Sequence, residues 1–450
     1  MVATTLIRDL RSTLLLLAGF LGLLAYIYFV ESKRPSSSEP EPTENVFSIE
    51  TDSIVALQIT ADNGETTTLE TSDGIWKIVS PRSLDADESE ISAITSSLSS
   101  LSIQRVVEEA SQDLEPFGLI KPQIDVAFRL NEAEEFKHLL IGRKTPTGGN
   151  LYASVEGENR VFLISGFLDN TFNRTTFDLR NKAVLRFDRD TVDALEITGN
   201  DRTIRLEKGA GEWFLTAPWK TRGDYAIAEG LLGRLSTVQM QSIVMEETST
   251  LDEFGLEHPE ITVTASAGGS LATLMIGEES PDNKFYARDT TRPMVFTIDT
   301  ALVNELNKEA SEYRRKELFE FRPFNSNRLE INHDDQIVTF EKIENTEDQE
   351  DQWRQLNPSR RDVERDKMDD LLTKLSNLRA SSFIESRANT GLAAPLVTIT
   401  VQFGEDNKEE SVILSKHEHE VFGSHVDEPG AAKINLQAFD ETLDALDKLK

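Results

Sequence analysis

Hydrophobic and polar positions follow two different periods along most of the chain. Segments in which every second side chain is apolar, such as 54–60 (IVALQIT), are typical of half-buried β-strands. Residues 85–101 instead place Ile91, Ile94 and Leu98 at spacings of three and four, which predicts an amphipathic α-helix. The other elements expected in this part are strands at 66–70, 75–79, 124–130, 136–141, 151–155 and 161–164 and a short helix at 166–172.

The same order of elements recurs twice. In the second set we expect strands at 194–198, 203–207, 213–216, 261–265, 272–276, 284–288 and 295–298 and helices at 226–238 and 300–306. In the third set we expect strands at 328–332, 337–342, 353–356, 397–403 and 410–414 and helices at 363–378 and 436–449. Short connections between strands favour antiparallel pairing, and one or two helices per set make an α+β fold.

Repeated motifs mark three units. Trp-x-x-x-x-Pro occurs at Trp76–Pro81, Trp213–Pro218 and Trp353–Pro358, and an acidic residue follows each Pro by six positions, at Asp87, Asp224 and Glu364. Gly-Leu-x-x-Pro begins at Gly118, Gly255 and Gly391, which are 137 and 136 residues apart. We interpret the Trp as a strand residue in a core and the Gly as the left-handed residue that closes a helical turn. The predicted units are residues 46–182, 183–316 and 317–450.

The N-terminal segment predicts a membrane anchor. Residues 14–30 (LLLLAGFLGLLAYIYFV) carry no charge, and a helix needs about 17–25 apolar residues to cross a bilayer. Arg8 and Arg11 precede this run, and no small-x-small cleavage pattern follows it. We therefore expect a cytoplasmic tail at 1–12, a single-pass signal anchor at 13–30 and a Pro/Ser/Glu tether at 31–45, with a cleaved signal peptide as the alternative. The body would lie in the periplasm or extracytoplasmic space, held at the inner (cytoplasmic) membrane.

Composition narrows the classes of function. With 79 acidic and 47 basic side chains, the formal net charge is −32, which repels nucleic-acid phosphates and anionic lipid heads. The chain has no cysteine, so disulfides, thiolate catalysis and cysteine-ligated metal sites are excluded. We expect no nucleic-acid partner.

One cluster has the residue types of a metal site. His417, His419 and His425, with Glu418 and Glu420 beside them, offer the imidazole and carboxylate ligands of zinc, nickel or copper. The corresponding segments of the other two repeats contain no histidine, so a polar hairpin tip is the simpler interpretation. We assign no catalytic, cofactor-binding or metal-binding residue and no cofactor.

Three further features are interpreted structurally. The acidic run 344–352 lacks the pattern of a calcium loop and predicts a solvated hairpin loop. Trp219 directly follows a proline and is the best tryptophan candidate for an exposed contact. The basic pairs at the ends of the first two repeats are expected to dock the acidic face of a neighbouring repeat; they are Arg180 with Lys182 and Arg315 with Lys316.

Several local patterns recur in the first two repeats and weaken in the third. They are the strand at 73–81, the Phe-Gly-Leu segments at 117–122 and 254–259, the Ile-Gly pairs at 141–142 and 276–277, and the Tyr-Ala pairs at 152–153 and 286–287. Together with the anchor, they resemble the bacterial family known as domain of unknown function 4340 over most of residues 46–450. The third repeat lacks the Phe before Gly391, the Ile-Gly pair and the Tyr-Ala pair. The resemblance implies an envelope protein encoded beside an ABC-type exporter with a gliding-motility-type subunit, and it supplies no catalytic residue.

These patterns lead to three hypotheses about function. The first is a non-enzymatic, membrane-anchored accessory or scaffold protein of an ABC-type transport or gliding-type export complex, with transporter subunits as partners. The second is a binding module for an envelope polymer or a secreted ligand, which an exposed row of aromatic side chains would favour. The third is a metal-dependent hydrolase that uses His417, His419 and His425, which requires stoichiometric bound metal.

Overall fold

A computed structural model describes residues 44–248, 250–333, 336–343 and 351–449. The predicted tail (1–12), the predicted anchor (13–30) and nearly all of the tether lie outside these residues. Within the described ranges, no helix has both the length and the apolar character needed to span a bilayer. The chain divides into two compact units, one ending at Asn181 and one beginning at Lys182. Unit 1 holds the first repeat, and unit 2 holds the second and third.

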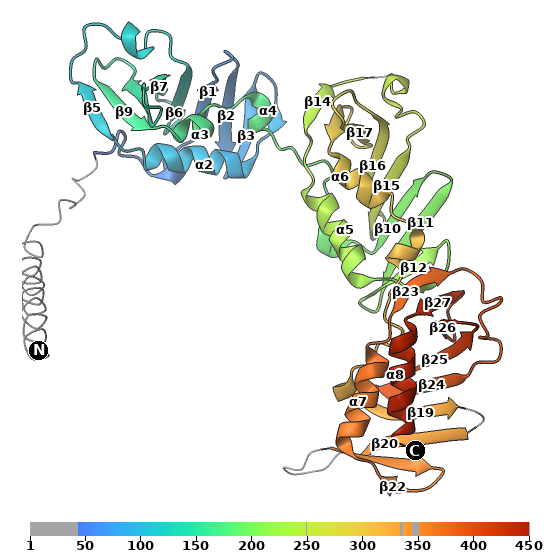
Figure 1. Ribbon diagram of the computed structural model, residues 1–450. Coiled ribbons are helices and arrows are strands. Elements are labelled where there is room, and N and C mark those ends of the chain that lie inside the picture. Colours follow the sequence, from blue (N-terminus) through green and yellow to red (C-terminus); the bar gives the residue numbers. More distant parts are fainter. Residues whose placement is uncertain (1–43, 249, 334–335, 344–350, 450) are drawn as a thin grey trace, which may run out of the picture. The chain divides into compact units, whose positions relative to one another are not determined.

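Each repeat forms one nine-stranded antiparallel sheet, and the three sheets share a single strand order (Figure 1). The order is β4-β3-β2-β1-β6-β7-β8-β9-β5 in the first repeat, and β10–β18 and β19–β27 repeat it. The first sheet contains β1 (Ala56–Thr60), β2 (Thr66–Ser72), β3 (Ile75–Ser80), β4 (Leu84–Asp85), β5 (Arg105–Glu108), β6 (Ile124–Arg129), β7 (Lys137–Lys144), β8 (Asn150–Val155) and β9 (Val161–Ser165). The second contains β10 (Ala194–Gly199), β11 (Arg202–Gly209), β12 (Glu212–Ala217), β13 (Thr221–Arg222), β14 (Ser242–Met245), β15 (Ile261–Ala267), β16 (Ser270–Glu279), β17 (Phe285–Asp289) and β18 (Val295–Ile298). The third contains β19 (Ser326–His333), β20 (Gln336–Ile343), β21 (Gln352–Asn357), β22 (Arg361–Asp362), β23 (Ala380–Ile384), β24 (Val397–Phe403), β25 (Lys408–His417), β26 (Glu420–His425) and β27 (Ala431–Ile434).

The first strand of each repeat joins two meanders into one sheet. In the first repeat, Leu57 of β1 faces Leu69 of β2 on one side and Phe128 of β6 on the other. All three side chains are buried, and they form one core with Ile91 and Ile94 of the long helix. The alternation that predicts each strand therefore also selects the face on which the helix packs.

One long helix packs in each of the first two repeats and two in the third, and shorter helices complete the layer. The α-helices are α2 (Glu88–Ser99), α3 (Leu168–Phe172), α4 (Thr176–Leu179), α5 (Tyr225–Thr237), α6 (Thr300–Leu306), α7 (Arg365–Ser376) and α8 (Leu436–Asp447). The 3-10 helices are η2 (Thr51–Ser53), η3 (Glu115–Phe117), η4 (Arg189–Thr191), η5 (Asp252–Phe254), η6 (Ala310–Tyr313) and η7 (Pro323–Asn325). The predicted α+β fold with antiparallel strands is confirmed, and the first repeat has one short helix more than expected.

The repeated acidic residue is the N-cap of the long helix. Asp87 accepts hydrogen bonds from the backbone N–H groups of Ser89 and Glu90, and Asp224 accepts one from Ile227. A carboxylate at this position satisfies free N–H groups and favours the positive end of the helix dipole. Glu364 occupies the same place before α7 but makes no side-chain cap bond.

The tryptophans of the repeated motif are core residues, as predicted. Trp213 and Trp353 are almost fully buried, and Trp76 packs against the core of the first repeat. The indole Nε1 of Trp213 donates to Glu229 at 3.0 Å, so the polar atom of this buried side chain is satisfied. The prolines that follow these strands, Pro81, Pro218 and Pro358, each come after a cis peptide bond.

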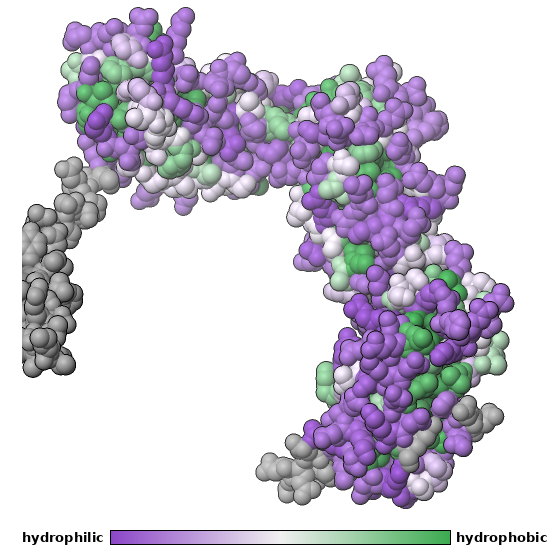
Figure 2. Space-filling view, in the orientation of Figure 1, coloured by the Kyte–Doolittle hydropathy of each residue, from purple (hydrophilic) through white to green (hydrophobic). Residues whose placement is uncertain are grey.

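Several strands of the three sheets were not predicted. The two-residue strands β4, β13 and β22 and the sheet-edge strands β5, β14 and β23 were not expected. In the third repeat β26 and β27 were also missed, because most of their side chains are buried on both faces and show no alternation. The surface seen in Figure 2 is mainly hydrophilic with scattered apolar residues, consistent with the net charge.

Candidate functional site

The Gly-Leu-x-x-Pro element is a turn that contacts a second glycine. Gly118 and Gly255 have left-handed backbones and close the 3-10 helices η3 and η5. A Cβ on Gly142 would lie 2.2 Å from the carbonyl oxygen of Phe117, and a Cβ on Gly277 would lie 2.1 Å from that of Phe254. The Ile-Gly pairs are therefore required by close backbone approach.

An aromatic pair fixes this turn in the first two repeats. The ring centroids of Phe117 and Tyr152 are 5.1 Å apart, and those of Phe254 and Tyr286 are also 5.1 Å apart. Phe254 belongs to a small buried cluster with Leu256 and Val295, separate from the main core of its repeat. The Phe-Gly-Leu and Tyr-Ala patterns thus describe one packing unit.

The third repeat builds the same turn differently. Thr390 stands in place of the phenylalanine, Ser415 in place of the second glycine and Phe422 in place of the tyrosine, as the strand register shows. The Ser415 hydroxyl donates to the Thr390 carbonyl oxygen. Gly391 keeps the left-handed backbone. In the third repeat the strand residue is therefore larger than in the other two, serine instead of glycine, and the turn residue is smaller, threonine instead of phenylalanine.

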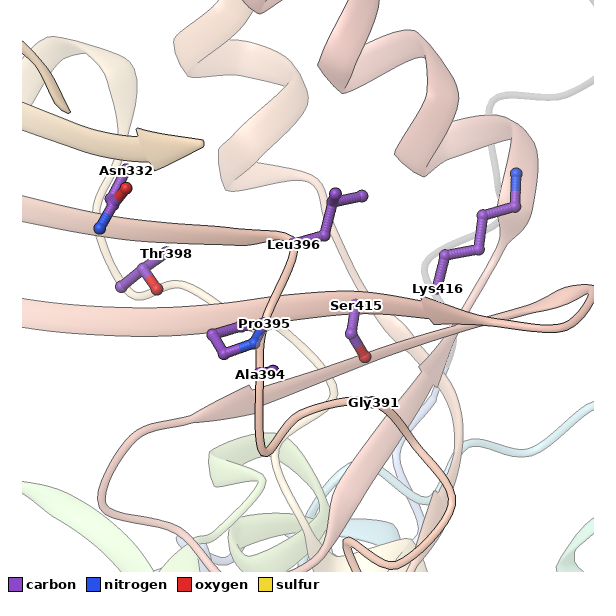
Figure 3. Close-up of a pocket in the computed structure, with 8 residues that line it drawn as sticks. All are labelled: Asn332, Gly391, Ala394, Pro395, Leu396, Thr398, Ser415 and Lys416. Carbon is purple, nitrogen blue, oxygen red and sulfur yellow. The ribbon is translucent and has the colours of Figure 1, made fainter. Parts of the chain in front are cut away.

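An open cleft of about 750 Å³ lies beside this altered turn (Figure 3). Gly391, Ala394, Pro395 and Leu396 of the turn line it, together with side chains of three strands. The strand residues are Asn332, Thr398, Ser415 and Lys416. Its polar groups are hydroxyls, one amide and one ammonium, and they provide no pair of groups that would activate a nucleophile.

The densest group of buried charges lies where the second and third repeats meet. Glu428, in the β26–β27 connection, accepts from the backbone N–H of Arg222 at 3.0 Å and from its Nε at 2.7 Å. Both side chains are 14% exposed. Arg314 is the second cation, with Nη2 3.6 Å from Glu428 and its guanidinium 4.1 Å from the Phe383 ring centroid. Glu428 therefore joins the edge and the end of the second repeat to the third.

A second carboxylate extends this junction. Glu320 lies 3.4 Å from Nη1 of Arg315 and 3.9 Å from Nη1 of Arg222, and it also pairs with Lys408. Its backbone N–H donates to the buried carboxylate of Glu410 at 2.9 Å. The contact between Arg315 and Glu320 agrees with the expectation that Arg315 pairs with an acidic residue of a neighbouring repeat. Arg222 and Arg314, which were not both expected there, pair with Glu428.

The environment shifts the pKa values of these groups in opposite directions. Burial alone would raise the pKa of the Glu428 carboxyl, but the charge and hydrogen bonds of Arg222 outweigh it and hold this pKa below its ordinary value. The pKa of Glu320 is lowered in the same way, because Lys408 and two arginines offset its burial. Burial raises the pKa of Glu410, and its two backbone hydrogen bonds offset only part of that effect. Strongly shifted groups mark functional sites in enzymes, but structural ion pairs shift pKa values too.

One arginine holds the connection that carries Glu428. Arg387 donates from Nη2 to the Ser424 hydroxyl at 2.9 Å and to the His425 carbonyl oxygen at 3.0 Å. Its Nε donates to the Gly430 carbonyl oxygen at 3.1 Å, and it also contacts the Glu428 carbonyl oxygen. These bonds hold the end of β26 against the irregular connection that follows it.

The three histidines that were considered as a metal site do not lie together. His417 pairs with Glu420 at the tip of the β25–β26 hairpin, whereas His425 faces Val412, five residue pairs away along the same ladder. At about 3.3 Å per residue, the tip and His425 are about 16 Å apart. In the described ranges, no group of three or more His, Asp or Glu side chains has the arrangement of a metal site. Burial and the charge of Arg222 hold the pKa of His425 below its ordinary value.

The other sequence candidates also have structural positions. Trp219 is half-buried against the core of the second repeat. Most of the acidic run (344–350) lies outside the described residues; beside it, Asp351 pairs with Lys342 at 2.8 Å. Sequence reasoning missed Arg222 and Glu428, which are 206 positions apart and carry no motif.

Comparison with known proteins gives one family. A family model described as "Domain of unknown function (DUF4340)" matches residues 76–224 and 213–395. Each match begins at a tryptophan of the repeated motif and continues into the following repeat. Together they cover more than half of the chain. No curated protein matches it.

Proposed function

Given that the chain belongs to the DUF4340 family, a domain of unknown function, we propose that it is a non-enzymatic scaffold or accessory protein of a membrane transport complex. In this proposal, residues 13–30 anchor it in the inner membrane, and the three sheets stand in the extracytoplasmic space. Its partners are the subunits of an ABC-type transporter.

One observation carries this proposal. Apart from Glu364, the repeated residues described above have packing, capping or turn roles: Trp213 fills a core, Asp87 caps a helix, and Gly277 permits close backbone approach. The buried charges of the junction likewise connect two repeats, through Glu428 and Arg222. A fold that uses its recurrent residues in this way is suited to holding partners at fixed positions.

Affinity purification tests the proposal directly. The tagged full-length protein is isolated from gently solubilised native membranes, and co-purifying proteins are quantified by mass spectrometry. Transporter subunits in near-equal amount are the expected result. Recovery of the protein alone, with unchanged export after deletion of its gene, would contradict the proposal.

A matched pair of variants shows whether the junction matters to assembly. Glu428→Ala removes the central carboxylate, whereas Glu257→Ala removes an exposed carboxylate of the second repeat. If the fixed arrangement of the two repeats supports partner binding, only Glu428→Ala reduces co-purification. If both variants recover the same amount of transporter subunits, partner binding does not depend on the junction and is assigned to a single repeat.

A further inference from the structure

One short segment, residues 322–325, contributes side chains to two open hollows of unit 2. The first, which we call the junction hollow, has a volume of about 480 Å³ and lies between the second and third repeats. The second, the Phe324 hollow, has a volume of about 410 Å³ and lies within the third repeat. Arg322 lines the first, and Phe324 and Asn325 line the second.

Each hollow has one exposed aromatic ring. Tyr225 in the junction hollow is 50% exposed, and Phe324 in the other is 79% exposed. In the described part of the chain, the only other aromatic residue exposed to this degree is Phe167, in unit 1. An exposed ring beside a hollow offers a flat apolar surface on which a ligand can stack.

The exposed tyrosine is specific to the second repeat. Tyr225 is the first residue after the N-cap of α5, and the same position is Glu88 in α2 and Arg365 in α7. A position that is charged in two repeats and aromatic in one is not required by the shared fold.

The charged groups around the rings are balanced in sign. The junction hollow contains Arg315, Arg322 and Arg379 and also Glu212, Asp224 and Glu317. The Phe324 hollow has one cation and one carboxylate, Lys342 and Glu405. Neither hollow therefore attracts an ion by net charge.

Hydrogen-bonding capacity remains in the Phe324 hollow. Asn327 donates to the Gly404 carbonyl oxygen at 2.8 Å and to Oδ1 of Asn407 at 2.9 Å, which leaves the amide hydrogens of Asn407 available. Asn325 accepts through Oδ1 from the Arg322 backbone at 2.8 Å, which likewise leaves its own amide hydrogens. Amide donors beside a carboxylate and an exposed ring match a ligand with many hydroxyls and an apolar C–H face.

We propose that these two hollows bind a neutral glycan chain, with Tyr225 and Phe324 each stacking on a sugar ring and the adjacent amide, guanidinium and carboxylate groups bonding its hydroxyls. An aromatic face and a few oriented polar groups are the usual means of fixing a polar ligand in an open site. The binding extends the scaffold function and does not depend on it.

Titration calorimetry of the full-length protein in detergent tests this assignment. The probes are cellohexaose, maltohexaose and chitohexaose, with hexagalacturonate as the anionic comparison. At least one neutral hexasaccharide is expected to bind, and hexagalacturonate is not. Tyr225→Ala and Phe324→Ala should each weaken binding by about tenfold or more. Phe167→Ala, which removes an exposed ring outside both hollows, should leave binding unchanged.

Three results would overturn the proposal: no binding of any neutral probe at millimolar concentration, equal binding by Phe324→Ala and Phe167→Ala, or preference for hexagalacturonate. Because both rings are exposed, unchanged thermal unfolding of the variants verifies that they fold. Phe324→Ala should still recover transporter subunits at the wild-type level. Co-purification therefore tests the scaffold function separately from glycan binding.

Discussion

The Glu428 carboxylate accepts both the backbone N–H and the side-chain Nε of Arg222, so that the β26–β27 connection of the third repeat is bound to the two-residue strand β13 of the second. A backbone donor fixes the position of the carboxylate, and a guanidinium supplies the opposite charge. The same carboxylate lies near Arg314, at the end of the second repeat.

Removal of this carboxylate should destabilise unit 2. Glu428→Ala removes the carboxylate near Arg314 and leaves Arg222 with only Glu320, at 3.9 Å, and breaking a buried ion pair in this way costs about 3–5 kcal/mol. Denaturant unfolding of the full-length protein should show the loss, and the exposed Glu257→Ala should stay within about 0.5 kcal/mol of wild type. Equal stability of the two variants would mean that the pair contributes nothing.

The acid sensitivity of unit 2 should depend on three carboxyl groups, of which two lower its stability on acidification and the third raises it. The folded-state pKa of Glu428 is lowered from 4.5, so its contribution is present above the unfolded pKa and is lost as pH falls through the folded value. Glu320 acts in the same direction. The pKa of Glu410 is raised, so the cost of its buried charge is present at neutral pH and disappears as it is protonated. Arg222, Arg314, Asp427 and His425 also surround this junction.

Unfolding free energies measured between pH 7 and pH 3 distinguish these contributions. Glu428→Gln should lose less stability than wild type on acidification, because the ionised pair is already absent. Glu410→Gln should lose more, because the gain from protonating Glu410 is absent. Parallel profiles for the two variants would contradict the assignment.

Arg387 forms none of the ion pairs described in the junction, but we expect it to hold the junction in place. Arg387→Ala removes the guanidinium that donates to several acceptors of the 424–430 segment, and hydrogen bonds to a charged group contribute about 1.5–3 kcal/mol. We expect faster hydrogen exchange of the amides in this segment and of the Arg222 amide. Arg354→Ala, which removes an exposed arginine paired with Asp362, serves as the control. Unchanged exchange at Arg222 would show that Arg387 supports only its own loop.

A methyl group at Gly277 should not be tolerated. The new Cβ of Gly277→Ala would lie 2.1 Å from the Phe254 carbonyl oxygen, so the turn must move at a cost of about 1–3 kcal/mol or more. Gly230→Ala is the matched change, because Gly230 lies inside α5 and a Cβ added there would meet nothing within 4 Å. There alanine should stabilise the protein by up to about 1 kcal/mol through its higher helix propensity. Thermal unfolding of both variants checks the opposite signs.

The repeated motifs predicted the fold because each acts locally. Asp224 caps a helix that begins at the next residue, and Gly255 closes a turn of three residues. Their roles follow from backbone geometry, which sequence spacing reveals. Alternation likewise located strands such as β1, where one face is buried and the other is not.

The junction could not be predicted because nothing local encodes it. Arg222 belongs to a strand of two residues, too short for any period, and Glu428 to an irregular connection 206 positions later. Their pairing depends on how two complete sheets pack. The histidines show the reverse case: His417 and His425 are close in sequence, but they lie far apart along the β25–β26 ladder.

The exchange of glycine for serine in the third repeat shows that the two sides of this turn depend on each other. In a repeat of the first kind, serine in place of Gly142 would force its Cβ toward the Phe117 carbonyl oxygen while the Phe117–Tyr152 pair still held the turn in place. In the third repeat, where Thr390 replaces the phenylalanine, the Ser415 hydroxyl donates to the Thr390 carbonyl oxygen. The strand residue and the turn residue therefore behave as one unit of substitution.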